Sequence, residues 1–185
     1  MRATWLKTVP KFVIIGTIPF LGLTLSVAVP TTASASGVSA ATITVLGGAL
    51  SITVPVDAGN LGTRANSVSG GTISGPLGQV QVNDARSPIA GSGWVASVIS
   101  SAFTPGTGTA IAASAVAYSV GPITKVGTAT YTANDPPNLT GVSPAVTATG
   151  ITGDNSATWN PTITVTVPGG MAATVYAATI THSVV

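Results

Sequence analysis

The stretch VQVNDARSPIAGSGWVASVISSAF, residues 80–103, decides the fold class that this sequence predicts. It opens with an alternation of apolar and polar side chains, in which Gln81 separates Val80 from Val82. Successive side chains of a β-strand point to opposite faces, so this alternation predicts a strand with one buried face. The turn-forming residues at 87–93 follow, and a second strand is expected from Trp94 onward.

The second strand has two faces of different character. One face would carry Trp94, Ala96 and Val98, and the other Val95, Ser97 and Ile99. The first of these faces holds the large aromatic side chain of Trp94. It is therefore a candidate for the core of a β-sheet protein.

Asp84 and Arg86 bring two opposite charges into this stretch. They continue the alternation of Val80 and Val82, which places both on the buried face if the strand persists. An isolated buried charge is costly, so we expect the two side chains to pair or to hydrogen-bond loop amides. Two interpretations stay open: a charge pair that pins the loop before Trp94, and a polar contact for a bound ligand.

The chain before residue 80 shows the same β pattern more weakly. Apolar residues alternate with Thr and Ser on both sides of a Gly-Gly pair at 47–48, which predicts a hairpin over residues 42–56. Pro55 indicates that this strand end lies at the edge of a sheet. Residues 57–78 are rich in Gly, Ser, Thr and Asn, so we expect a loop with one short strand near 71–74.

The chain after residue 103 continues with turns and strands. A turn is expected at 105–108, and a strand at 126–132. Residues 111–120 are rich in Ala, which suits a helix, but their periodicity and flanking residues favour a strand. Residues 134–138 contain two prolines and are expected to form a loop.

The C-terminal region gives the clearest β signal. Residues 162–167 alternate Thr with Ile or Val, a Pro-Gly-Gly turn follows, and alternate residues from Tyr176 to Val184 would share a face. This pattern predicts a terminal hairpin. The whole chain is therefore predicted to be all-β, an antiparallel β-sandwich of about seven to nine strands after an N-terminal signal peptide helix.

The first 35 residues have the features of a secretory signal peptide. They combine three basic residues, an apolar run at 12–29 and the small-residue cleavage site Ala33-Ser34-Ala35. Retention of this segment as a membrane anchor is the alternative, because the run is close to the length of a spanning helix. We expect removal, secretion to the cell surface and membrane contact only through this leader.

The remaining residues, 36–185, limit the function classes. They carry three basic residues and four aspartates, a formal net charge of −1, with no Cys and no Glu. A nucleic-acid partner is excluded, because it would need several Lys or Arg side chains to neutralise phosphates. Without disulfides, a secreted domain of this kind depends on its apolar core for stability.

Two segments of the chain resemble WxL-type cell-surface domains of Gram-positive bacteria. The sequence Gly93-Trp94-Val95-Ala96-Ser97-Val98, preceded by Asp84 and Arg86, is similar to the proximal motif of that family. Trp159 is expected to open a strand, as Trp94 does. Together with the strand at 162–167, the Pro-Gly turn and Thr174-Val175-Tyr176, it is similar to the distal motif. Ala96 and Pro161 stand where the family motifs have Leu.

The resemblance implies a single WxL-like β-sandwich domain over residues 36–185. It also implies a non-catalytic protein that is held non-covalently at the cell wall, with peptidoglycan or another wall polymer as its partner. Other surface proteins are alternative partners. A structural subunit of a surface layer or fibre, self-associating through sheet edges, is the competing function.

Four residues are candidates for the wall-binding or structural motif: Asp84, Arg86, Trp94 and Trp159. The two indoles could form a platform that stacks on sugars, or each could fill the sandwich core with its N–H bonded to a carbonyl. We predict no catalytic residue, no metal and no cofactor. His182 is the one histidine of the chain and has no recognisable nucleophile or acid beside it.

The remaining polar candidates have simple interpretations. Asp135 and Asp154 lack the spacing of a calcium loop, so we expect turn-forming residues that bond their own backbone. Asn138-Leu139-Thr140 matches the N-glycosylation pattern, but a bacterial origin would leave that pattern unused.

Overall fold

The computed structural model describes residues 42–87 and 91–185. The predicted signal peptide at 1–35 and residues 88–90 of the predicted turn lie outside this part. All strands belong to one compact unit, Thr44–Val185. No helix in the described part is both long enough and apolar enough to cross a membrane.

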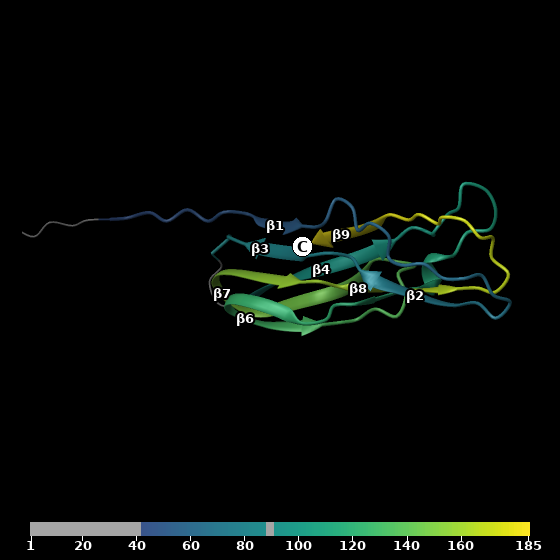
Figure 1. The fold of residues 1–185 in the computed structure, drawn as a ribbon. Coiled ribbons are helices and arrows are strands. Elements are labelled where there is room, and N and C mark those ends of the chain that lie inside the picture. Colours follow the sequence, from purple (N-terminus) through teal and green to yellow (C-terminus); the bar gives the residue numbers. More distant parts are fainter. Residues whose placement is uncertain (1–41, 88–90) are drawn as a thin grey trace, which may run out of the picture. The chain divides into compact units, whose positions relative to one another are not determined.

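Residues 42–87 and 91–185 form an all-β sandwich of nine antiparallel strands (Figure 1). The larger sheet has the order β1-β3-β7-β4-β9, and β6 pairs with β7 as well. Its strands are β1 (Leu50–Thr53), β3 (Val80–Asp84), β4 (Ser92–Ser100), β6 (Ile123–Ala133), β7 (Ser143–Trp159) and β9 (Ile180–Val184). The smaller sheet has the order β2-β8-β5, with β2 (Gly71–Pro76), β5 (Val116–Ser119) and β8 (Thr162–Val167). The predicted fold class is confirmed.

The longest strand, β7, organises the larger sheet. Its first half pairs with β4, and its second half pairs with β3. The strand β6 lies along its other side, from the pair Ile123–Trp159 to the pair Ala133–Val146. The strand β7 therefore pairs with three other strands, β3, β4 and β6.

The core forms where the inner faces of the two sheets meet. The alternation in β3 and β4 buries Val80, Val82, Trp94, Ala96 and Val98, as the sequence predicted. The smaller sheet contributes Tyr118, Ile163 and Val165 to the same apolar cluster. Removal of this apolar surface from water stabilises the fold, at about 25 cal/mol per Å².

The predicted hairpin over residues 42–56 is wrong. Residues 42–49 form no strand, and β1 pairs with β3 instead. The Gly-Gly pair packs against the chain after β3: the Gly48 amide bonds the Ala85 carbonyl, and a Cβ on Gly47 would lie 2.8 Å from the Arg86 carbonyl oxygen. Glycine is needed here for close backbone approach rather than for a hairpin turn. As Pro55 indicated, β1 lies at the end of its sheet.

The predicted C-terminal hairpin is also wrong. The strand β8 lies in the smaller sheet, whereas β9 pairs with β4 in the larger one. The chain between them crosses from one sheet to the other, and Thr104 and Ala177 bridge it to the continuation of β4. The predicted alternation from Tyr176 to Val184 is nevertheless confirmed, with every second side chain half-buried.

Two smaller predictions need correction. The segment 111–120 is only partly strand, because a single 3₁₀ turn, η1 (Ala113–Ala115), precedes β5. Trp159 does not open a strand but ends β7. The loops at 105–108 and 134–138, the short strand in the 71–74 region and the strand over 126–132 are confirmed.

Candidate functional site

Asp84 and Arg86 form the expected ion pair at the end of β3. The Arg86 Nε and Nη2 atoms donate to the Asp84 Oδ1 and Oδ2 atoms at 2.8 and 3.0 Å, and the Arg86 amide donates to Oδ1 at 3.1 Å. The Asp84 side chain is fully buried, whereas that of Arg86 is 38% exposed. Planar guanidinium and carboxylate groups pair strongly in this two-point geometry.

The ion pair connects the chain before the predicted turn at 87–93 to the chain after it. The Arg86 Nη2 atom also donates to the carbonyl oxygen of Gly93, at 3.3 Å, next to Trp94. The hydrogen bond from Arg86 lowers the pKa of Asp84, and Asn155 contributes in the same direction against the effect of burial. The carboxylate is therefore held in its charged form.

Asn155, on β7, connects this ion pair to the first tryptophan. Its Nδ2 atom donates to the Asp84 Oδ2 atom at 3.3 Å, and its Oδ1 atom accepts from the Trp94 Nε1 atom at 3.0 Å. The Asn155 side chain is almost completely buried. We call Asp84, Arg86, Trp94 and Asn155 the clasp, because together they join β3, β4 and β7.

Tyr131, on β6, extends the clasp to a fourth strand. Its hydroxyl donates toward the Asn155 Oδ1 atom at 3.3 Å, and its ring centroid lies 5.8 Å from that of Trp94. The Lys125 Nζ atom lies 5.7 Å from the centre of the Tyr131 ring, within the range of a cation–π contact. Burial raises the pKa of Tyr131, and the Asp84 charge raises it further.

Trp159 forms a second polar network that connects the two sheets. Its Nε1 atom donates to the Tyr118 hydroxyl oxygen at 2.9 Å, and that hydroxyl lies 3.1 Å from the His182 Nε2 atom. Burial raises the pKa of Tyr118 and lowers the pKa of His182 to about 4. At neutral pH this network is uncharged.

Neither tryptophan is available as a sugar-stacking platform. Trp94 and Trp159 are each 2% exposed, so their faces contact protein rather than solvent. Both fill the core, the second of the two interpretations left open by the sequence. Their N–H groups bond side-chain oxygens, on Asn155 and Tyr118, rather than backbone carbonyls.

The other polar candidates are used in local structure. Asp135 has a positive φ of 41° and accepts a hydrogen bond from the Val120 amide, while Asp154 lies within β7 and accepts one from the Ser87 hydroxyl. Neither bonds its own backbone as predicted. Asn138 is exposed in its loop, where its side chain accepts a hydrogen bond from the Thr140 amide.

The described residues offer few groups for chemistry. Within 42–87 and 91–185, no cluster of three or more His or Asp side chains could hold a metal ion. His182 contacts the phenol of Tyr118, with their ring centroids 5.6 Å apart. The polar side chains of both networks mainly bond one another, which fixes the strands that carry them.

Sequence reasoning missed three residues of these networks: Asn155, Tyr131 and Tyr118. Asn155 has the same parity as Ala157 and Trp159, which β7 buries on one face. That parity could have identified it as a buried amide, had the strand been extended upstream of Trp159.

Comparison of the chain with protein-family models, with curated proteins and with solved structures found no match. The likeness to WxL-type domains therefore depends on the motif residues alone. The geometry shows that the three residues that resemble the proximal motif, Asp84, Arg86 and Trp94, all belong to the clasp.

Proposed function

We propose that this chain is a non-catalytic module of the bacterial cell surface that associates non-covalently with a wall polymer such as peptidoglycan. The observation that carries the proposal is the clasp. The residues that resemble the proximal WxL motif, Asp84, Arg86 and Trp94, are brought together in one hydrogen-bonded cluster. This joint structural role gives the resemblance a physical basis, and it is the resemblance to wall-binding domains, not the fold alone, that supports the proposed function.

A second observation supports a polymer rich in hydroxyl groups as the partner. The outward face of β6 and β7 is covered by threonines that are paired across the two strands. The pairs are Thr124–Thr158, Thr128–Thr152, Thr130–Thr149 and Thr132–Thr147. All eight side chains are exposed or half-buried. Hydroxyl groups both donate and accept hydrogen bonds, which matches the groups that a glycan presents.

Co-sedimentation with purified Gram-positive cell walls tests the proposal. We expect the protein to pellet with the walls in a saturable manner. Recovery of all the protein in the supernatant over a range of wall concentrations would rule out wall association.

A threonine-to-valine variant tests the face that makes the contact. Replacing Thr128, Thr130 and Thr149 by Val keeps the branched shape but removes three hydroxyls. We expect wall affinity to fall about tenfold or more, since each hydrogen bond contributes about 1 kcal/mol. The double variant Thr72→Val with Thr166→Val, a neighbouring pair on the smaller sheet, is the matched control.

Self-association through a sheet edge is the second candidate function. Among the described strands, β6 pairs only with β7, and most of its side chains, including Val126, are exposed. An open edge of this length can add another strand, although Lys125 and the irregular register near Gly127 oppose it. Light scattering over a concentration series distinguishes the candidates, because a strict monomer would exclude the subunit function.

A further inference from the structure

The segment before β1 has the sequence of a strand but no strand partner. Residues 42–46, TITVL, alternate Thr with Ile or Val and end in Leu, and we call them the arm. Among the described residues, no strand pairs with the arm and its backbone makes no hydrogen bond. Val45 and Leu46 are 79% and 87% exposed. Addition to the edge of a sheet would satisfy the backbone groups and bury apolar surface at once.

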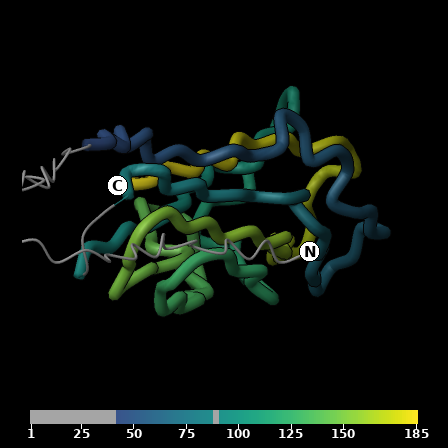
Figure 2. The backbone as a smooth tube through the Cα atoms, turned by 90° about the vertical axis from the view of Figure 1, so that its left-hand side faces the viewer, coloured from purple at the N-terminus to yellow at the C-terminus, as the bar shows by residue number. Residues whose placement is uncertain are grey.

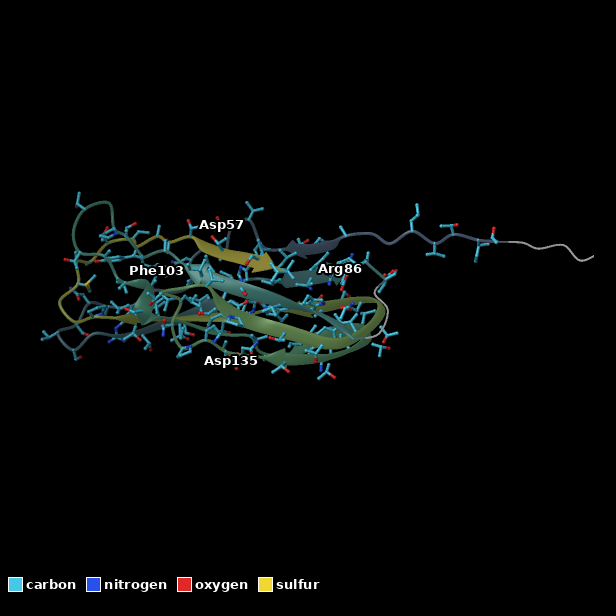
Figure 3. All side chains as sticks on the ribbon, turned by 180° about the vertical axis from the view of Figure 1, so that it is seen from behind. Asp57, Arg86, Phe103 and Asp135 are labelled. Atoms are coloured by element: carbon cyan, nitrogen blue, oxygen red, sulfur yellow. The ribbon has the colours of Figure 1, made fainter. Side chains whose placement is uncertain are left out.

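Two glycines fix the base of the arm away from β6. Gly47 and Gly48 pack against the chain after β3, beside Arg86. The strands β3 and β6 pair with the same stretch of β7, residues 155–159, so they lie on its opposite sides. Figure 2 shows β1, in blue, and β6, in green, along opposite margins of the tube. In Figure 3, Arg86 lies well apart from Asp135, which follows the end of β6.

The free edge of β6 is the longest that the described chain offers to another strand. Within residues 42–87 and 91–185, β6 pairs only with β7. The edge of the short strand β5 is partly covered, because the Tyr118 amide donates to the Pro136 carbonyl oxygen at 3.0 Å. The strand β2 contains two glycines and ends at Pro76, which makes it a poor template. The strands β1 and β9, at the ends of the larger sheet, lie close to each other.

The second half of β6, residues 129–133, matches the arm in the character of its two faces. Thr130 and Thr132 are exposed on the outer face, whereas Ala129 and Tyr131 face the core. The arm also has a threonine face and an apolar face, so an added arm would continue both. The small side chain of Ala129, at the margin of the core, leaves room for a larger β-branched neighbour. Such matching of alternate side chains gives strand addition its specificity.

The features that protect β6 against edge pairing lie outside this half. Lys125 and Gly127 both precede residue 129, and the Lys125 Nζ atom lies over the Tyr131 ring of its own chain. The register with β7 shifts twice between Val126 and Thr130 and is regular from there to the end of the strand. Residues 129–133 carry no charge. A regular, uncharged edge is the kind to which another strand adds.

We propose that the arm of one copy adds as an antiparallel strand to residues 129–133 of a second copy, with Thr44 opposite Thr130. Ile43 and Val45 then lie beside Tyr131 and Ala129 of that copy. The contact joins two different surfaces of the chain, so it can continue from copy to copy. The inference rests on the second candidate function, self-association through a sheet edge, and names the two segments that pair. It does not depend on wall association.

Light scattering of Val45→Asp over a concentration series tests the role of the arm. We expect the mean mass of the unmodified protein to rise with concentration. Val45→Asp should need at least about tenfold higher concentration to reach the same mass, because the added strand would bring a charge to the margin of the core. Val142→Asp, at an exposed position before β7, is the matched control and should associate as the unmodified protein does.

Disulfide mapping tests the pairing itself, since the chain has no cysteine of its own. Thr44→Cys and Thr130→Cys, mixed in equal amounts and oxidised, should form a mixed disulfide between two copies. Opposed residues of paired strands lie roughly 4.5–5.5 Å apart between Cα atoms, within the range of a disulfide. Thr44→Cys mixed with Thr166→Cys, on the smaller sheet, is the control and should give much less of the mixed product.

The outcomes separate this inference from the candidate function on which it rests. A strict monomer would overturn both. Association that Val45→Asp leaves unchanged, or a mixed disulfide no more abundant than the control, would overturn the inference alone. An intrachain disulfide in the double variant Thr44→Cys with Thr130→Cys, formed at dilutions where the protein is monomeric, would place the arm on its own β6 and would also overturn it.

Discussion

The Trp94 indole donates a hydrogen bond to the Asn155 side chain across 61 positions of sequence, at 3.0 Å, inside the larger sheet. The same amide donates to the Asp84 carboxylate at 3.3 Å. Asn155 therefore satisfies a buried donor and a buried acceptor at once. The stability of the fold should therefore depend on both the oxygen and the nitrogen of the Asn155 amide.

Replacement of Asn155 by Ala should destabilise the fold by about 2–4 kcal/mol. The change leaves the Trp94 N–H group without a partner and removes one donor from Asp84, and each unmet buried group costs about 1–3 kcal/mol. Urea unfolding followed by tryptophan fluorescence measures the effect. Asn138→Ala, at an exposed loop position, is the control and should change stability by less than about 0.5 kcal/mol. Equal stabilities of the two variants would contradict a structural role for Asn155.

The Asp84–Arg86 pair should make stability sensitive to acid. The pKa of Asp84 is lowered below its ordinary value of 3.8, chiefly by the hydrogen bond from Arg86. The stability that the charged Asp84 side chain contributes to the fold is therefore complete above about pH 4. It is lost as the pH falls through the lower pKa that Asp84 has in the folded state. Arg86→Ala should lose stability at neutral pH and show a weaker decline below pH 4. Unfolding free energies between pH 2 and pH 7 measure both effects, and parallel curves for the two proteins would contradict this account.

His182 should add a separate acid transition at higher pH. Burial lowers its pKa from 6.5 to about 4, so the unfolded chain takes up a proton that the folded chain resists. Its contribution to stability is complete above about pH 6.5 and is lost as the pH falls from there toward about 4. His182→Gln removes the titrating ring but keeps a polar partner for Tyr118. We expect its stability to be flatter between pH 6.5 and pH 4, and an unchanged slope there would disprove the assignment.

Gly47→Ala should destabilise the fold by about 1–2 kcal/mol, because the new methyl group would lie 2.8 Å from the Arg86 carbonyl oxygen. Gly141→Ala is the matched control, since a Cβ there meets no atom within 4 Å. Thermal unfolding of both variants measures the difference. Similar transition temperatures would show that the segment before β1 moves away from Arg86 without cost.

The inward and outward faces of the strands were predictable from sequence, but their partners were not. Alternation in residues 80–103 placed Val82 and Trp94 correctly in the core. The same kind of pattern at 162–184 gave the correct faces and the wrong pairing, because β8 and β9 belong to different sheets. Alternation specifies which face is buried and carries no information about which strand lies alongside.

The longest strand was missed for a physical reason. Gly150 and Gly153 have positive φ angles within β7, and the register with its neighbours shifts in this region. Buried side chains therefore recur at irregular intervals, at Ala148, Ile151 and Asn155, instead of every second residue. β-Bulges of this kind hide a strand from any search for strict alternation.

The candidate site was predictable only in part. The Asp84–Arg86 pair follows from the cost of burying a single charge, which the sequence made visible. Asn155, Tyr131 and Tyr118 lie far away along the chain, and only the fold brings them to the two tryptophans. Their hydrogen bonds depend on the strand order, which the sequence did not reveal.

The position of β7 also has a consequence for the order of assembly. Val80 pairs with Trp159, so the early strand β3 lacks its central neighbour until most of the chain has emerged. Contacts between residues this distant form slowly, because a long loop must close before they contribute. The first half of the chain therefore has no complete sheet to fold into on its own. During synthesis, β3 and β4 therefore remain without their shared neighbour until β7 has been made, and the larger sheet forms late.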